Sequence, residues 1–266
     1  MKEEVIKSLL VISTHRIIIF RIGVESAAST DWLKSYENQP ISELRYIDIG
    51  LGYQTLRLEF ETECSSYTLL IADEGKCKQF LTLISDIVAH SDHSHLEGIG
   101  KSNPTTYTNL ENQVLKADDN SSYQKLVSFL MLKYTHANTD EKVRKSLAIT
   151  QTDLVLIDEN HQWPLPRLQA SLAGAIKKRQ FTIVWREKIN NIGTLSFNEF
   201  NPKELKLSFL EPTAFGNPST WIISFETMKG VKSFVDAIRG PWEAEFGISL
   251  DISSVAFADS ENISVA

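Results

Sequence analysis

Residues 67–71 read YTLLI, and after Asp73 residues 77–84 read CKQFLTLI. In the first run, apolar side chains fall at every second position, and this period of two predicts a β-strand with one apolar face. In the second run, apolar side chains recur at helical spacing and form one stripe. Asp73 is a good N-cap residue, because its side-chain oxygen accepts hydrogen bonds from the free amides of a first helical turn. The stretch therefore predicts a strand followed by a capped helix that packs against a sheet.

The same stretch returns near the end of the chain. Residues 221–225 read WIISF, Thr227 is a second N-cap candidate, and residues 231–238 read VKSFVDAI. The shift between the copies is 154 residues throughout, since position 221 matches 67 and position 234 matches 80. A constant shift over strand, cap and helix indicates an internal repeat.

Earlier strands repeat as well, at smaller shifts. The shift is 137 residues for the opening hairpins (Ile12 and Ile149), 145 for the next strand (Leu44 and Ile189) and 149 for the strand after it. A shift that only grows along the chain is typical of a duplicated unit with insertions in surface loops. We therefore predict two copies of one fold.

The composition is that of a soluble globular protein with room for two ordinary domains. The chain has 266 residues, of which 42% are hydrophobic and 23% are charged. No apolar run is long enough to cross a bilayer, and the N-terminus lacks the pattern of a secretory signal. Two cysteines, Cys64 and Cys77, are too few for a disulfide framework, and the net charge of −7 argues against broad nucleic-acid binding. We expect a cytoplasmic protein without a transmembrane segment.

The repeat sets the predicted domain boundaries. Residues 1–96 form the first domain, residues 97–122 a flexible linker, residues 123–250 the second domain and residues 251–266 a disordered tail. The apolar run at 126–134 favours an additional strand that opens the second domain. Nothing equivalent precedes the first unit, which is therefore expected to begin inside a domain.

The last helix is expected to end or break at Gly240-Pro241. Proline in a helix interior removes an amide donor, and its ring clashes with the preceding turn.

One unit is thus a hairpin, a third strand, further antiparallel strands and a single closing helix. The hairpin LVISTHRIIIF at 10–20 and the strand ISELRYI at 41–47 resemble the opening strands of pleckstrin-homology-like domains, and within them the GRAM-like variants. The resemblance implies a mostly β fold with α: two small antiparallel β-barrels or sandwiches, each closed by a C-terminal helix. The tryptophan common in that helix is missing, and Phe80 or Phe234 takes its place. The paired units also resemble the C-terminal region of leucine-rich-repeat scaffolds of the nischarin and LKB1-interacting-protein type.

The resemblance implies a binding platform rather than an enzyme. A small sandwich filled by its own side chains leaves loops, strand edges and helix flanks as binding surfaces. The sequence has no Gly-rich phosphate loop, no nucleophile elbow and no paired-carboxylate signature, so no catalytic residue, cofactor or metal is expected. We expect a non-catalytic adaptor or scaffold for protein partners, with small GTPases of membrane trafficking as candidates and endosomal membranes as a candidate location. The alternative is a peripheral membrane module that binds phosphoinositides.

A basic cluster would carry the phosphoinositide alternative. Family members that bind these lipids use lysines and arginines near the mouth of the barrel. The densest such cluster here is Lys177, Lys178, Arg179, Arg186 and Lys188. It lies outside the hairpin turn that usually carries the basic motif, and the competing interpretation is a solvated surface run.

A second candidate surface is the proline-containing segment WPLPRL at 163–168. Its side chains Trp163, Leu165, Arg167 and Leu168 are candidates for binding a partner groove. The competing interpretation is a strand-edge segment that packs on its own domain.

Overall fold

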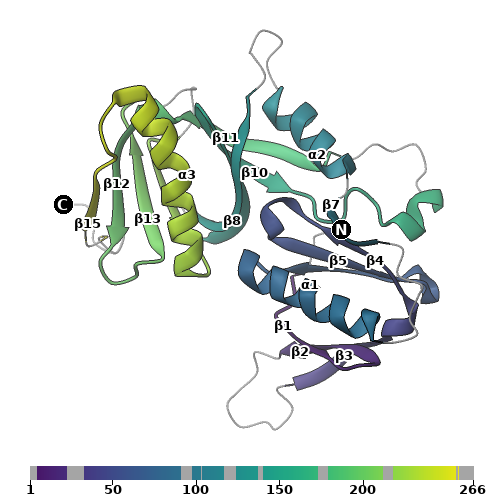
Figure 1. The fold of residues 1–266 in the computed structure, drawn as a ribbon. Helices are drawn as coiled ribbons and strands as arrows, with labels where there is room; N and C mark the ends of the chain where they lie inside the picture. The colour runs from purple at the N-terminus through teal and green to yellow at the C-terminus, as the bar shows by residue number, and fades with distance from the viewer. Residues whose placement is uncertain are drawn as a thin grey trace.

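The computed structural model describes residues 5–22, 33–90, 98–102, 104–116, 124–136, 140–172, 179–211, 218–255 and 257. Two units of strands and helices lie side by side (Figure 1). Both are open β-sandwiches with few helices, as the sequence predicts, and neither closes into a complete barrel.

The first unit contains two sheets and one long helix. One sheet has the order β1-β2-β3, and the other has the order β6-β5-β4-β7. Their bounds are β1 Ser8–Ile12, β2 Arg16–Ile22, β3 Leu33–Pro40, β4 Leu44–Ile49, β5 Thr55–Phe60, β6 Ser66–Leu70 and β7 Gly98–Ser102. The helix α1 (Glu74–Ala89) follows β6 and lies between the two sheets in Figure 1.

The core of the first unit confirms the predicted alternation. Leu56, Leu58 and Phe60 of β5 are fully buried, and α1 buries Cys77 and Ile84 against them. The side chain of Asp73 accepts a hydrogen bond from the amide of Lys76 at 3.1 Å, which satisfies a donor of the first helical turn.

The second unit is built on one bent sheet of eight strands in the order β11-β10-β9-β8-β14-β13-β12-β15. Their bounds are β8 Leu126–Thr135, β9 Lys142–Thr150, β10 Asp153–Glu159, β11 Phe181–Lys188, β12 Ile192–Asn198, β13 Glu204–Phe209, β14 Thr220–Ser224 and β15 Ile252–Val255. The helix α3 (Met228–Phe246) packs on this sheet, and α2 (Pro104–Leu110), which continues as a π-helical turn Glu111–Leu115, lies near β10 and β11 (Figure 1).

The second copy of the opening stretch behaves as the first one does. Trp221 of β14 and Phe234 and Ile238 of α3 are completely buried in one core. The side chain of Thr227 accepts a hydrogen bond from the amide of Gly230 at 3.2 Å. Strand and helix are therefore held by the same apolar contacts and the same kind of cap in both units.

The strand pairings also match between the units, with one correction. The 3₁₀ turns Ile41–Glu43 and Ile189–Asn191 occupy the same place, so Ile189 matches Ile41 and not Leu44. The shift at this strand is therefore 148 residues rather than 145, and the shift still grows along the chain. The strand predicted at 126–134 is present as β8.

The predicted linker and tail are wrong where the structure describes them. Inside 97–122, residues 98–102 form β7, and residues 104–115 form α2 and its π-helical turn. Inside 251–266, residues 252–255 form β15. Strand β7 pairs in parallel with β4, and β15 pairs in parallel with β12. Edge pairing and apolar contacts, which composition does not reveal, order these polar stretches.

The last helix does not end at Gly240-Pro241. It runs through Pro241 to Phe246, so Trp242 lies inside α3 rather than after it. Trp242 packs against the core of the second unit and contacts Phe246 with ring centroids 4.5 Å apart and the ring planes tilted by 46°. This packing offsets the hydrogen bond that proline removes, which costs about 3 kcal/mol in a helix interior. The closing helix of the second unit therefore does carry a tryptophan.

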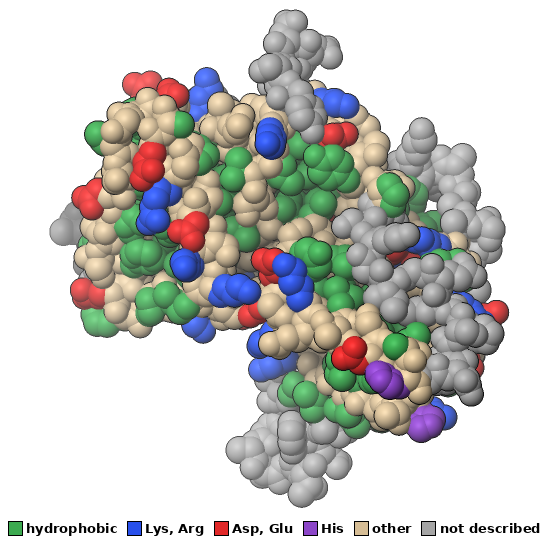
Figure 2. Space-filling view, viewed as in Figure 1, with side chains coloured by type: hydrophobic (Ala, Val, Ile, Leu, Met, Phe, Trp, Pro, Cys, Tyr) green, Lys and Arg blue, Asp and Glu red, His purple; other side chains and the backbone are tan. Residues whose placement is uncertain are grey.

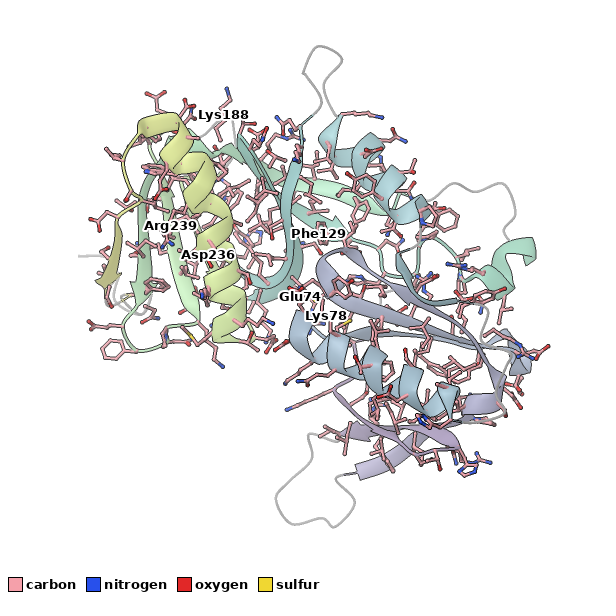
Figure 3. All side chains as sticks on the ribbon, viewed as in Figure 1. Glu74, Lys78, Phe129, Lys188, Asp236 and Arg239 are labelled. Atoms are coloured by element: carbon pink, nitrogen blue, oxygen red, sulfur yellow. The ribbon has the colours of Figure 1, made fainter. Side chains whose placement is uncertain are left out.

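A tight backbone approach joins the two units at the turn before β5. Gly52 has a φ of +61°, and a Cβ at this position would lie 2.2 Å from the backbone oxygen of Phe129 on β8. Next to it, the side-chain oxygen of Gln54 accepts a hydrogen bond from the buried amide of Met131 at 3.2 Å. Figure 3 shows Phe129 at this junction. The turn therefore fits directly against the backbone of β8.

We predict that Gly52→Ala destabilises the chain by about 2 to 4 kcal/mol, because the added methyl group meets a backbone oxygen that cannot move aside. Gly240→Ala is the matched control, since nothing lies within 4 Å of a Cβ there. Urea unfolding should show the control within about 1 kcal/mol of the natural chain. Equal stability of the two variants would show that Gly52 does not lie against the backbone of Phe129.

Candidate functional site

The segment between β10 and β11 reaches from the second unit onto the first. Arg57 on β5 donates hydrogen bonds to the backbone oxygens of Pro164 at 2.5 Å and His161 at 2.7 Å. Burial lowers the pKa of Arg57, while the carboxylates of Glu59 and Asp48 act in the opposite direction. An arginine stays charged in proteins, so the first unit presents a buried cation to two carbonyl groups of the second.

The end of the same segment binds two acidic side chains of the first unit. Arg167 lies 2.6 Å from a carboxylate oxygen of Asp48 and stacks over the ring of Tyr46 at 5.0 Å. The amide of Leu168 donates a hydrogen bond to Glu59 at 3.1 Å. Asp48 and Glu59 are both buried, so these contacts compensate part of the cost of removing two carboxylates from water.

His161 lies inside this interface as a neutral side chain. Burial lowers its pKa to about 4, and the charges of Arg144 and Arg57 act in the same direction. Glu159 is 3.7 Å from the imidazole and favours the protonated form, but at this distance it is not hydrogen bonded. Burial therefore dominates, and the imidazole is uncharged at neutral pH.

The structure places the predicted partner-binding residues at this interface between the units. Trp163, Leu165 and Leu168 are half-buried, and Arg167 forms an ion pair with Asp48. The segment packs on the first unit, and not on its own domain as the competing interpretation has it. Binding of a separate partner by these four side chains remains a prediction.

Sequence reasoning missed the residues of the first unit that receive this segment. Arg57 and Glu59 alternate with leucines in β5, a pattern that normally indicates a solvent-exposed face. Glu59 is instead completely buried beneath the second unit. A single sequence carries no signal for this burial, because it depends on contacts more than 100 residues apart along the chain.

The predicted basic cluster is not brought together by the residues that the structure describes. Arg186 points inward, where it donates to the backbone oxygen of Val114 at 2.6 Å and lies 3.6 Å from Asp153. Arg179 precedes β11 and Lys188 ends it, and both are exposed, so this eight-residue strand of roughly 25 Å lies between them. Lys177 and Lys178 lie outside the described residues. On the face drawn in Figure 2, basic side chains lie among acidic ones and form no single basic area.

A cavity of about 310 Å³ opens between the units where the first turns of α1 and α3 meet β8. Its lining mixes backbone, apolar side chains and charges of both signs, including Asp73, Glu74 and Lys229. Within the described ranges, no group of three or more His, Cys, Asp or Glu side chains is placed to hold a metal ion. Cys77 is buried, and burial raises its thiol pKa to about 11, so it is a poor nucleophile at neutral pH.

Two helix-closed sandwiches with matching strand order define a pair of pleckstrin-homology-like domains, and family comparisons agree with this class. Residues 1–97 match the family model described as the PLEKHM2 PH domain-like region. Residues 109–255, more than half of the chain, match the model of the STK11-interacting protein C-terminal PH domain. The chain belongs to this STK11-interacting protein family of PH domains.

Curated relatives point the same way. The chain is 28% identical to the chicken (Gallus gallus) serine/threonine-protein kinase 11-interacting protein over 158 residues, which cover 55% of this chain and 15% of that protein. It is 22% identical to the mouse (Mus musculus) protein of the same name over 257 residues, which cover 91% of this chain and 23% of that protein. The chain thus spans less than a quarter of these relatives. The predicted resemblance to scaffolds of the LKB1-interacting-protein type is confirmed.

The solved structures that match this chain are only distantly similar to it. A structure of inhibited Vav1 matches with a TM-score of 0.38 and 9% identity, covering 66% of this chain and 41% of that one. The hSac2 domain of the human phosphoinositide phosphatase Sac2 matches with a TM-score of 0.34 and 11% identity, covering 61% and 94%. In the part of the chain that the structure describes, no helix is both long and apolar enough to cross a membrane.

We predict that Arg57→Ala lowers the free energy of unfolding by about 3 kcal/mol, because it leaves two carbonyl groups without their donor and removes a cation beside the buried carboxylate of Glu59. Arg239→Ala is the control. Arg239 forms an exposed contact with Asp236 on α3 (Figure 3), and its loss should cost less than about 0.5 kcal/mol. Chemical denaturation of both variants measures the difference, and a mild effect of Arg57→Ala would show that the interface is loose.

The low pKa of His161 predicts a loss of stability in mild acid. The unfolded imidazole takes up a proton near pH 6.5, whereas the folded one resists until about pH 4. The neutral imidazole therefore makes its full contribution to the free energy of unfolding above pH 6.5. This contribution decreases as the pH drops toward 4, by at most about 3 kcal/mol. Melting temperatures from pH 7.5 to 4.5 should fall more steeply for the natural chain than for His161→Gln. Parallel curves would mean that His161 titrates normally.

Proposed function

We propose that this chain is a non-catalytic protein-interaction platform within a scaffold, and that its partners are signalling or trafficking proteins such as small GTPases. Its relatives are named for interaction with serine/threonine-protein kinase 11, which makes this kinase a second candidate partner. Family membership supports the protein-binding role, since PH-like domains present loops and strand edges rather than a deep substrate cavity.

The observation that carries the proposal is the way the two units are joined. The contacts of Arg57, Arg167 and Leu168 fix one PH-like unit against the other through buried polar groups. Two units held in one orientation offer a partner a single, larger surface, and less conformational entropy is lost on binding than with units that swing freely. Preorganisation of this kind suits a scaffold.

The described geometry favours protein partners over phosphoinositides. A phosphorylated head group needs several cations converging within a few ångströms. Arg186 is engaged internally, and Arg179 and Lys188 are far apart. Lipid binding and endosomal association are therefore treated as the alternative result, which the liposome experiment below would detect.

Binding of purified components tests the proposal. The 266-residue chain should bind serine/threonine-protein kinase 11, or at least one trafficking GTPase in its GTP-bound state, with a saturable dissociation constant of roughly micromolar strength. It should not sediment more with phosphoinositide liposomes than with phosphatidylcholine liposomes.

Two results would contradict the proposal. One is the absence of binding to the kinase and to every GTPase in both nucleotide states. The other is phosphoinositide-selective sedimentation that a Lys177→Glu, Lys178→Glu, Arg179→Glu variant abolishes, because this would assign the function to the basic cluster.

A further inference from the structure

The cavity of about 310 Å³ is built jointly by the two units. The first unit contributes Gly52 and Gln54 of the turn before β5 and the first turn of α1, and the second contributes β8 and the start of α3. Gly52 and Gln54 also hold the units together, through their contacts with Phe129 and Met131 of β8. The cavity is therefore continuous with the junction, and it exists only while the units are docked.

Apolar side chains make up much of the lining. Phe129, Met131 and Phe225 are buried, Leu51 of the first unit is half-buried, and Val127 on β8 is 44% exposed. The volume lies at the lower end of the range for specific ligand sites, about 300 to 1,000 Å³. A cavity of this size suits one large apolar side chain of a partner, which is how anchor residues bind at the centre of protein interfaces.

The charges at the cavity are unevenly compensated. Asp73 accepts the hydrogen bond that caps α1, and Glu74 forms an ion pair with Lys78. Lys229 forms no ion pair with a described residue, and its ammonium nitrogen would lie 3.1 Å from a Cβ at Gly75, in the first turn of α1. The uncompensated charge at this place is therefore positive, although the whole chain carries −7.

Two further lysines add to this positive charge. Lys76 and Lys232 are exposed on the opening turns of α1 and α3, and neither forms an ion pair within the part of the chain that the structure describes. Opposite charges across an interface speed association and exclude wrong partners. A matching occupant therefore carries carboxylates beside its apolar side chain.

We propose that this cavity binds an acidic segment of a partner protein, which inserts one large apolar side chain between the units while its carboxylates face Lys76, Lys229 and Lys232. The inference deepens the proposed function and rests on it, because it identifies where a protein partner binds and by what chemistry. Since both units line the cavity, the segment binds only the docked arrangement and stabilises it.

Fluorescence anisotropy with a defined peptide tests this inference. The probe is a labelled seven-residue peptide with phenylalanine in the middle and aspartate or glutamate at the other positions. It should bind the 266-residue chain saturably, with a dissociation constant of roughly 10 to 100 µM. One control peptide has serine in place of phenylalanine, and another has lysine in place of every acidic residue. Each control should bind at least about tenfold more weakly.

Charge-reversal variants locate the binding site. Lys229→Glu should weaken probe binding at least about tenfold, because it places a carboxylate where the acidic groups of the probe lie. Lys206→Glu on β13 is the control, since it makes the same change at an exposed position outside the cavity, and it should change the affinity less than about twofold. Equal affinities of the two variants, or no binding of the probe to the natural chain, overturn the inference.

A third variant tests whether both units are needed. Arg57 does not line the cavity, but Arg57→Ala removes contacts that hold the units together. The dissociation constant of the probe should rise at least about threefold in this variant, or in Arg167→Ala if the former does not fold. An unchanged affinity in a folded variant would mean that one unit binds the probe alone, which overturns a jointly built site.

Two outcomes would assign the cavity to another occupant. Citrate that competes with the probe and binds as tightly at constant ionic strength would show that a small organic anion suffices. A dimer by light scattering that excludes the probe would show that a second copy fills the cavity. Either result overturns the inference.

Binding of the kinase and of GTPases separates this inference from the proposed function. If one of these proteins binds the natural chain and Lys229→Glu equally well, the site is rejected and the proposed function stands. If none of them binds, while the probe binds and Lys229→Glu abolishes its binding, the site stands and these partners are rejected.

Discussion

Strand β8 is the element on which most of the structure depends. It pairs with β9 and β14, and thereby joins the two halves of the second unit's sheet. One of its faces fills the core of the second unit, while its backbone at Phe129 and Met131 meets Gly52 and Gln54 of the first. A single strand therefore closes one domain and docks the other, so its hydrogen bonds contribute both to local folding and to domain arrangement.

Buried charge reinforces this arrangement. Arg57 lies between carboxylates of its own unit and carbonyl groups of the other, and Arg167 reaches Asp48 in the opposite direction. Removing these charged side chains from water costs free energy. Hydrogen bonds and ion pairs compensate this cost only when the two units are in one relative orientation. The interface is therefore specific, since a sliding or rotated arrangement would break the contacts that Arg167 and the amide of Leu168 make with Asp48 and Glu59.

The sequence predicts the repeated fold because the fold depends on local patterns. Alternation in β5 and β14, helical stripes in α1 and α3, and caps at Asp73 and Thr227 are all readable within short windows. What the sequence does not reveal depends on distant contacts. The strands β7 and β15 are polar stretches that only their pairing with β4 and β12 orders, and Arg57 faces the second unit although its pattern indicates solvent. The sequence indicates a candidate partner segment at 163–168, but it does not reveal which residues lie next to this segment in space.

The central claim is that the two PH-like units form one body with a fixed orientation. Electron–electron distance measurements between spin labels at Lys78→Cys on α1 and Arg239→Cys on α3 test it most directly. The positions are exposed and lie on different units (Figure 3), and Cys77 is buried and resists labelling, while Cys64 is replaced by serine. The account predicts one narrow distance distribution that broadens in Arg57→Ala. A broad distribution in the natural chain would contradict it.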